Sequence, residues 1–439
     1  MTLDPDRAPA PTDDFAPLAR RLAEAGKRAA RPLSTASTAQ KNAMLSQLAA
    51  LLVEPTEVAR ILAANAQDLA AGQQAGLSAA LLDRLRLDTG RLAALSQAVR
   101  DIAALPDPVG EVVESWTRPR GFSVEKRRIP LGLLLLIYEA RPNVTIDAAA
   151  LAIKSGNAVL LRGGKEARHS NLALSQLVQT ALRGQGLPED AARFVDNPDR
   201  GLMLALLQQS GFIDLCIPRG GEALIRFVVE HARVPVIQHY QGVCHMYVDA
   251  DADLDMAVAL IENAKCSRPG VCNALECLLI HEAQAAALLP ALAPRLARYG
   301  VELRLPPAAM ALLPSPIPDG LRPRPVTADD YGREFLDQIL AVRIVPSLDA
   351  AIAHIADYGS LHSEVIVTQN ASAAARFQRE VCASFVGWNL STRFNDGGEL
   401  GLGAEVGIST SKLHAFGPMG LRELCSTKFV ATGTGQVRG

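Results

Sequence analysis

The pattern of apolar and polar positions divides the chain into a helical first quarter and a longer region where strands and helices alternate. Over residues 37–105 apolar side chains recur at helical spacing, as at Leu45 and Leu48. Residues 1–36 are rich in proline, alanine and charge, and we expect a loosely held lead-in with helical character only over residues 15–30. The first quarter is therefore predicted to be mainly helical.

The remaining pattern predicts an exposed hairpin followed by two α/β series. Residues 108–128 alternate apolar and polar, which is typical of an exposed hairpin or arm. After them, short apolar stretches separated by helix-compatible segments predict βαβ units and parallel sheets with covered faces. The first series of expected strands is Gly132–Ile137, Ala158–Leu161, Arg193–Val195, Phe212–Ile217 and Val234–Ile237. The second is Met246–Val248, Cys277–Ile280, Ala341–Val345, Val365–Val367 and Phe385–Trp388. The prolines of residues 305–325 predict a surface loop.

Two α/β series in one chain predict two domains with a cleft between them. Composition agrees, because 439 residues suggest roughly two or three domains and 49% hydrophobic with 4% aromatic residues is typical of an α/β enzyme. With 44 basic and 46 acidic residues, no global field favours nucleic acid or an anionic membrane. The longest apolar run, residues 131–138, is far shorter than the roughly 20 residues that span a bilayer.

Cysteine usage and the amino terminus predict a cytoplasmic location. The first residues are acidic where a secretory signal needs a basic start. Seven cysteines without CxxC or His-paired spacing favour a reducing compartment over a disulfide framework or a zinc site, and we expect no metal.

The segment SRPGVCNALE places Cys272 in a loop between a helical stretch and a strand. A thiolate there could attack a carbonyl carbon, although at a usual pKa near about 8.5 only a few per cent of the thiol is ionised. A cysteine that serves as a small buried hydrophobe is the alternative, and this segment alone leaves both interpretations open. The others are expected to be structural, in apolar strand or helix contexts: Cys216, Cys244, Cys266, Cys277, Cys382 and Cys425.

Two turns with paired glycines follow predicted strands and open predicted helices. Free N–H groups at a helix start, beside a cation, can bind phosphate, although such a turn can equally be a tight connection. Neither turn is a GxGxxG fingerprint. The residues are Arg162, Gly163, Gly164 and Lys165 in the first turn, and Arg219, Gly220 and Gly221 in the second. The charges of the first turn would suit a 2'-phosphate.

Two further polar segments carry candidate residues. In YEARPNVT, the Asn143 amide could donate to an oxyanion or could cap the next helix. The glycine-rich run STRFNDGGELGLGAEVGIST suits a substrate loop or an ordinary surface loop, and Arg393 is its only cation.

These segments together resemble the gamma-glutamyl phosphate reductases, a branch of the aldehyde dehydrogenase superfamily, over residues 36–430. The motifs that carry the resemblance are PLGLLLLIYEARPNVT, SGNAVLLRGGKEA, IPRGG, VPVIQHYQGVCHMYVD, SRPGVCNALE, and NLSTRFNDGGELGLGAEVGIST followed by KLHAFGPMGL. The resemblance implies an aldehyde dehydrogenase-like fold: two Rossmann-like α/β domains plus a small β oligomerisation arm. The expected division is an NADPH-binding domain at 1–115 and 133–243, a catalytic domain at 244–419, and the arm at 116–132 and 420–439.

The resemblance also implies roles for single residues. Cys272 matches the nucleophile, and Asn143 matches the oxyanion asparagine, which would act with the backbone N–H of Cys272. Arg162 falls where the superfamily keeps a lysine for the adenosine ribose, and Glu334 where it keeps the nicotinamide-ribose glutamate. The substrate of the family carries an amino-acid carboxylate, which calls for a cation. The substrate-binding candidates are Arg141, Asn389, Thr392 and Arg393.

The reaction implied is NADPH-dependent reduction of L-glutamyl 5-phosphate to L-glutamate 5-semialdehyde, with release of phosphate, in proline biosynthesis. The arm implies a homodimer or larger assembly, and the upstream glutamate kinase is a possible partner. Hydrolytic relatives carry a water-activating glutamate, whereas residues 239–243 here read HYQGV without a carboxylate. His239 is expected to pack in a core rather than transfer protons. The alternatives are an acid-forming aldehyde dehydrogenase and an inactive structural or binding member of the fold.

Overall fold

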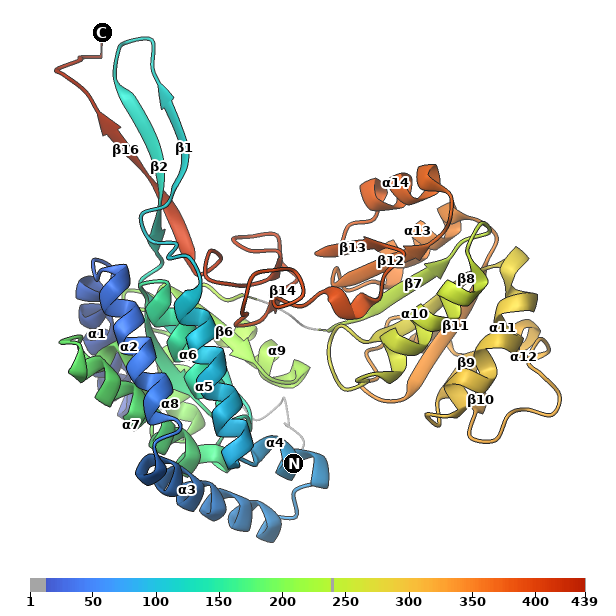
Figure 1. Ribbon diagram of the computed structural model, residues 1–439, viewed down its shortest axis with the longest axis horizontal. Helices are drawn as coiled ribbons and strands as arrows, with labels where there is room; N and C mark the ends of the chain where they lie inside the picture. Colours follow the sequence, from blue (N-terminus) through green and yellow to red (C-terminus); the bar gives the residue numbers. More distant parts are fainter. Residues whose placement is uncertain (1–12, 238–240, 439) are drawn as a thin grey trace. The chain divides into compact units, whose positions relative to one another are not determined.

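The computed structural model describes residues 13–237 and 241–438 (Figure 1). The chain forms two compact units. The first comprises Met1–Gln238, Leu402–Gly407 and Met419–Gly439, and the second comprises His239–Gly401 and Ile408–Pro418. The first unit thus contains the three-stranded arm, which the expected division counted separately.

The core of the first unit is a four-stranded parallel sheet in the order β5-β4-β3-β6. All six residues of β3 are buried, because helices cover both faces of such a sheet. Its strands are β3 (Leu133–Tyr138), β4 (Ala158–Arg162), β5 (Ala192–Phe194) and β6 (Leu215–Arg219). The predicted strand at 234–237 is wrong: only an isolated bridge joins Val236 to Cys216. Pro235 has no N–H to donate, which limits ladder formation there.

The helical character expected over residues 15–30 is confirmed as part of the first helix of this unit. The expected loose lead-in is wrong from Ala16 onward, since α1 buries Leu22, Ala23 and Leu33 and packs on β3 and β4. Its helices are α1 (Ala16–Leu33), α2 (Thr38–Leu51), α3 (Pro55–Gln74), α4 (Ala79–Leu85), α5 (Thr89–Ala104), α6 (Asn143–Lys154), α7 (Arg168–Gly184), α8 (Arg200–Leu207) and α9 (Glu222–His231). Among the described residues, no helix of the chain is long and apolar enough to cross a membrane.

The predicted hairpin is present and gains a third strand from the carboxyl terminus. β1 (Val112–Thr117) pairs with β2 (Ser123–Pro130), and β16 (Cys425–Thr432) pairs with the other edge of β2, all antiparallel. The three strands project from the α/β body of the first unit (Figure 1). Trp116 and Phe429 meet edge to face at 6.1 Å between ring centroids.

The second unit is built on a seven-stranded parallel sheet in the order β10-β9-β11-β8-β7-β12-β13. Its strands are β7 (Cys244–Val248), β8 (Leu275–His281), β9 (Glu302–Leu305), β10 (Arg322–Pro325), β11 (Ile339–Val345), β12 (Ser363–Val367) and β13 (Phe385–Trp388). Its helices are α10 (Leu254–Cys266), α11 (Glu282–Ala297), α12 (Pro307–Met310), α13 (Leu348–Tyr358) and α14 (Ala371–Glu380). Two short strands, β14 (Ile408–Ser409) and β15 (Gly417–Pro418), form a separate ladder.

Successive residues of these strands enter separate cores on the two faces of the sheet. Met246 and Val248 join a cluster with α10 and α11, whereas Tyr247 joins a cluster with α13 and α14. The prediction of an irregular loop over 305–325 is wrong, because it contains α12 and β10. β10 is the edge strand, and an edge tolerates prolines that a central strand would not.

Candidate functional site

Cys272 lies in the turn that joins α10 to β8 in the second unit. Ala274 N–H donates to the carbonyl of Val271, which closes the turn around the thiol. The residue is partly exposed, and its backbone lies in this hydrogen-bonded turn. This environment favours the reactive interpretation of the cysteine over a buried structural one.

The other cysteines differ from Cys272 in their environments. All seven thiols are free. Burial raises the pKa of Cys266 and of Cys425 to about 12. It also raises the pKa of Cys216 and Cys244 above their ordinary values. The expectation of an apolar strand or helix context is wrong for Cys382, which is exposed in the loop between α14 and β13.

The Cys272 turn is joined to residues 391–395 by buried hydrogen bonds. Thr392 Oγ1 donates to the carbonyl of Asn273 at 2.7 Å. In return, the Asn273 amide donates to the carbonyls of Arg393 at 3.2 Å and Asn395 at 3.0 Å. The structure therefore brings three predicted site residues, Cys272, Thr392 and Arg393, together near the amino-terminal end of β8.

Two guanidinium groups lie beside this turn. Burial lowers the pKa of Arg393, and the nearby charge of Arg268 lowers it further, while Asp396 and Cys272 oppose the shift. An anion bound between two such cations would reduce the electrostatic repulsion between them. Arg268 was not singled out from the sequence, although a cation inside the SRPGVCNALE motif was a signal that could have indicated it.

The non-strand segment just before β7 passes directly beside the backbone of Cys272. A Cβ atom on Gly242 would lie 2.2 Å from the carbonyl oxygen of Cys272, so only glycine fits. Cys244 Sγ donates to the same carbonyl at 3.1 Å. His239 and Tyr240 lie outside the described residues.

The predicted ribose ligand, Glu334, lies in a half-buried loop of the same unit. This loop approaches the Cys272 turn: a Cβ on Gly270 would lie 3.8 Å from the carbonyl oxygen of Leu336. Glu334 and Cys272 are thus on neighbouring loops.

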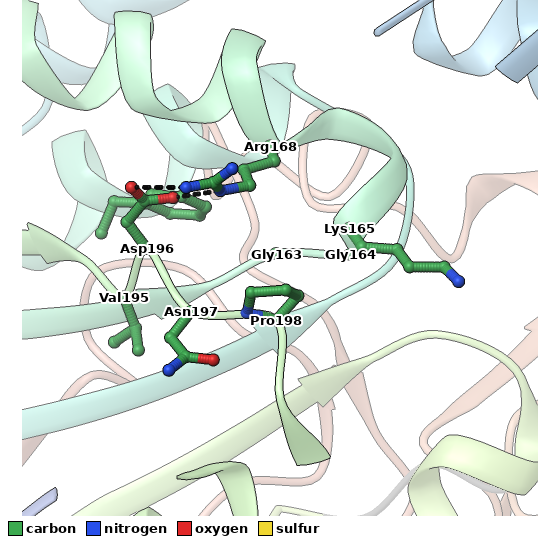
Figure 2. Close-up of a pocket in the computed structure, with 9 residues that line it drawn as sticks. Gly163, Gly164, Lys165, Arg168, Val195, Asp196, Asn197 and Pro198 are labelled. Carbon is green, nitrogen blue, oxygen red and sulfur yellow. Dashed lines mark hydrogen bonds and ion pairs between the residues drawn. The ribbon is translucent and has the colours of Figure 1, made fainter. Parts of the chain in front are cut away.

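In the first unit, the turn after β4 lines a pocket with residues that follow β5 (Figure 2). Lys165 is exposed and its side chain extends away from the pocket wall, whereas Arg168 is bonded to Asp196 at 2.6 Å. Arg162 donates to the carbonyl of Pro198 at 2.7 Å, and its buried Nε has no partner among the described residues. This polar atom and the exposed ammonium group fit an anionic or ribose-bearing ligand.

Of the two glycines of this turn, Gly163 has a packing role. A Cβ on Gly163 would lie 2.2 Å from Nδ2 of Asn171, and one on Gly164 would lie 2.6 Å from the Glu166 carboxylate. Close packing against Asn171 and Tyr138 therefore explains Gly163 without a ligand, whereas the Glu166 carboxylate beside Gly164 is the end of a flexible side chain.

The second glycine turn already holds a carboxylate of the chain itself. The Gly221 N–H, at the start of α9, donates to Glu139 at 3.2 Å. A Cβ on Gly220 would lie 2.7 Å from the carboxyl carbon of Glu139. Glu139 thus occupies the position that a phosphate would take, and phosphate binding by Arg219, Gly220 and Gly221 stays a prediction.

Asn143 is the first residue of α6 and does not cap that helix, because Pro142 holds the N-cap position. Its Nδ2 donates to the carboxylate of Asp147, one helical turn further on, at 3.0 Å. This hydrogen bond fixes the orientation of the amide. Burial raises the pKa of Asp147 to about 6, while this hydrogen bond and the charge of Arg219 act in the other direction. Arg141 is exposed in the turn just before α6. Asn143 belongs to the first unit and Cys272 to the second.

The side chain of Asn389 is hydrogen-bonded to the backbone of its own unit. It adopts a left-handed φ of 55°, and its amide accepts from and donates to the backbone of Thr368, at 2.9 Å each. Substrate binding by Asn389, and by the buried Thr392, stays a prediction.

A buried polar cluster lies between the second sheet and α13. Ligand atoms of His245, Cys277 and His354 lie within 4.8 Å of one another, the spacing of a candidate metal centre. However, Arg343 donates to Nδ1 of His354 at 2.7 Å, so the imidazole proton sits on Nε2 and faces Cys277 Sγ at 3.6 Å. That nitrogen has no lone pair to offer, and the cluster is a hydrogen-bonded network.

The comparisons with known proteins agree with this geometry. The aldehyde dehydrogenase family matches residues 16–309, more than half of the chain. A gamma-glutamyl phosphate reductase from Sorangium cellulosum is 57% identical over 422 residues, 95% of this chain and 97% of the relative. One from Anaeromyxobacter sp. (strain K) is 55% identical over 419 residues, with the same coverage.

The chain belongs to the gamma-glutamyl phosphate reductases of the aldehyde dehydrogenase family. The crystal structure of a gamma-glutamyl phosphate reductase from Thermotoga maritima matches with a TM-score of 0.92 at 42% identity, over 96% of this chain and all of that one. The aldehyde dehydrogenase-like fold predicted from the sequence is therefore confirmed. Enzymes of this fold family use nicotinamide cofactors.

Proposed function

We propose that this chain catalyses the NADPH-dependent reduction of L-glutamyl 5-phosphate to L-glutamate 5-semialdehyde with release of phosphate, a step of proline biosynthesis. The observation that carries the proposal is the partly exposed Cys272, held in a hydrogen-bonded turn beside two arginines. The relatives named gamma-glutamyl phosphate reductase support the same substrate.

Cys272 would act as the nucleophile. Its thiolate attacks the acyl carbon, phosphate leaves, and the acyl group remains on sulfur as a thioester. The backbone N–H of Cys272 and the amide of Asn143 would stabilise the oxyanion of each tetrahedral intermediate. Loss of one such donor typically costs about a hundredfold or more in rate.

The arginines beside the turn would bind the anionic substrate. Arg393 and Arg268 disfavour each other's charge, and a phosphate or carboxylate group between them would remove that repulsion. Arg141, Asn389 and Thr392 remain further substrate-binding candidates.

Bound NADPH would supply the hydride for the thioester carbon, and the aldehyde would form as the Cys272 thiolate leaves. Lys165, Arg162 and Glu334 would hold this cofactor, with Lys165 on the 2'-phosphate and Glu334 on the nicotinamide ribose. The exposed ammonium group of Lys165 and the buried, unpartnered Nε of Arg162 support this assignment. Gly163 and Gly164 would let the backbone of this turn approach the cofactor.

The arm supports assembly with a second copy of the chain. β1 and β16 are the outer strands of its sheet, and Phe429 is 69% exposed on it. Unpaired strand edges with apolar side chains favour pairing with another chain. We propose a homodimer or larger homo-oligomer in the cytoplasm, where free thiols persist. Transfer of a labile acyl phosphate would make the upstream glutamate kinase a useful partner.

The test is phosphate dependence in the reverse direction. With L-glutamate 5-semialdehyde and NADP+, the enzyme should form NADPH only when inorganic phosphate is present, because phosphate releases the acyl group from sulfur. NADPH formation without phosphate would indicate an acid-forming aldehyde dehydrogenase. No NADPH formation under either condition would favour an inactive member of the fold.

A further inference from the structure

A buried ion pair closes the ends of the Cys272 turn. Lys265 lies in the last turn of α10, Glu276 lies in β8, and Nζ is 2.7 Å from Oε2. Their side chains are 0% and 1% exposed. A buried pair is weak evidence for stability, because desolvation offsets the attraction and an apolar pair of similar volume is often as stable. The pair therefore calls for a role besides stability.

The second oxygen of the same carboxylate holds another loop. Glu276 Oε1 accepts the backbone N–H of Leu336 at 3.2 Å. Leu336 has a left-handed φ of 55°, and its side chain is 48% exposed. This conformation costs a leucine roughly 1–2 kcal/mol, and an exposed side chain contributes little packing to offset it. The hydrogen bond to Glu276 is thus a main restraint on this backbone.

Glu276 joins two loops. One carries Cys272, the proposed site of the thioester, and the other carries Glu334, the proposed ligand of the nicotinamide ribose. Lys265 is one residue before the end of α10, from which the Cys272 turn begins, and Leu336 is two residues after Glu334. The Leu336 carbonyl also lies beside Gly270. Burial raises the pKa of Glu276 to about 7, Lys265 lowers it, and the nearby Glu334 carboxylate raises it. That last effect places Glu334 within electrostatic range of Glu276.

We propose that Glu276, neutralised by Lys265, is a positioning residue that fixes the Glu334 loop against the Cys272 turn, and so aligns the nicotinamide ribose with the thioester. The inference rests on the proposed function. A carboxylate suits this position because each oxygen accepts one donor, whereas a glutamine offers one acceptor and one donor group. Glu276→Gln therefore keeps the side-chain volume but can accept a hydrogen bond from only one of the two donors, Lys265 Nζ or the Leu336 N–H.

The test compares Glu276→Gln with the wild type in the phosphate-dependent assay. Loosening the Glu334 loop should lower kcat about tenfold and raise KM for NADP+ by a similar factor, since misplacement by about 1 Å can cost up to a hundredfold. The rate of Cys272 alkylation by iodoacetamide should stay within about twofold, because the nucleophile itself is intact. Unchanged kcat and KM would overturn the proposal, and so would an alkylation rate that fell as far as kcat.

A double-mutant cycle separates positioning from a general structural effect. In a Glu334→Gln background, Glu276→Gln should add little to KM, because it acts through a side chain that is already altered. Fully additive effects would contradict the mechanism.

A second variant covers the case in which Glu276→Gln does not fold. Lys265→Met combined with Glu276→Leu replaces the pair with apolar groups of similar size and should raise KM for NADP+ in the same way. Lys41→Met with Asp107→Leu, which removes a buried pair of the first unit, is the matched control and should leave KM unchanged. Wild-type KM in the Lys265/Glu276 double variant would overturn the proposal. A wild-type enzyme that forms no NADPH in this assay would instead remove the proposed function itself.

Discussion

The two loops proposed to serve catalysis are held in different ways. In the second unit, the Cys272 turn is fixed by side-chain hydrogen bonds from Thr392 and Asn273 that involve buried groups. In the first unit, the turn after β4 leaves Lys165 exposed, and its Gly163 is explained by packing. A covalent nucleophile must stay in one geometry throughout the reaction, whereas a cofactor site must admit and release its ligand in each turnover. The difference therefore fits the proposed roles: many internal hydrogen bonds for a covalent nucleophile, and an exposed cation for an exchangeable cofactor.

The largest expected effect is at the nucleophile. Cys272→Ser should lower phosphate-dependent NADPH formation by at least about a thousandfold, because a serine hydroxyl at neutral pH is almost entirely un-ionised. The matched control is Cys382→Ser, which alters the exposed cysteine of the second unit and should keep wild-type activity. If Cys272→Ser retained more than about a tenth of the activity, a thioester route would be ruled out.

The second effect concerns the exposed cation of the other loop. Lys165→Met should raise KM for NADP+ about tenfold to a hundredfold, as expected for losing a charged hydrogen bond of about 1.5–3 kcal/mol. KM for NAD+ should change little, since that dinucleotide lacks the 2'-phosphate. Arg168→Met is the control, because Arg168 lines the same pocket but is bonded to Asp196. Equal changes in KM for both dinucleotides would show that Lys165 does not recognise the 2'-phosphate.

A smaller effect tests whether internal bonding matters for the nucleophile turn. Thr392→Val keeps the shape but leaves the Asn273 carbonyl without its donor, at a cost of about 1–3 kcal/mol. We expect kcat to fall about tenfold while KM for NADP+ stays the same. Thr392→Ser restores the hydroxyl and should restore most of kcat. A change in substrate KM alone, with kcat intact, would instead support direct substrate binding by Thr392.

The sequence predicted buried strands correctly but was wrong about segments that contain prolines. Apolar runs such as residues 133–138 indicate buried strands because both faces of a parallel sheet are covered. The pattern failed at residues 234–237, where a proline reduces a strand to a bridge, and at 322–325, where an edge strand accepts prolines. Local periodicity carries no information on whether a segment lies at the edge of a sheet.

Site prediction had a related limit. The motif around Cys272 indicated a candidate nucleophile, but the partners that hold its turn come from residues about 120 positions away, such as Thr392. Likewise, nothing in the sequence around Gly221 indicated that Glu139 would accept its N–H. Hydrogen bonds between distant segments depend on strand order, which a single sequence does not specify.

The smallest expected effect concerns acid stability of the second unit. Burial lowers the pKa of His354 to about 3, and the charges of His245 and Arg343 act in the same direction. His354 is therefore neutral in the folded chain, whereas in the unfolded chain it takes up a proton near pH 6.5. As pH falls from about 6.5 toward 3, the unfolded state gains a proton that the folded state does not, so stability is lost.

His354→Gln should reduce the loss of stability as pH falls below about 6.5. Thermal unfolding temperatures measured from pH 7 to pH 4.5 would show this. Each kcal/mol corresponds to roughly 2–4 °C in a domain of this size. His245 provides the contrast of opposite sign: burial disfavours its charge, but the Glu364 carboxylate and Cys277 together outweigh burial and raise the pKa to about 10. Its contribution is complete below about pH 6.5 and is lost as pH rises through 10, so the His354 variant should leave the loss of stability at alkaline pH unchanged. If the unfolding temperature of the variant fell with pH as steeply as that of the wild type, another group would control acid stability. The hydrogen bond from Arg343 to His354 would then not determine how this unit responds to acid.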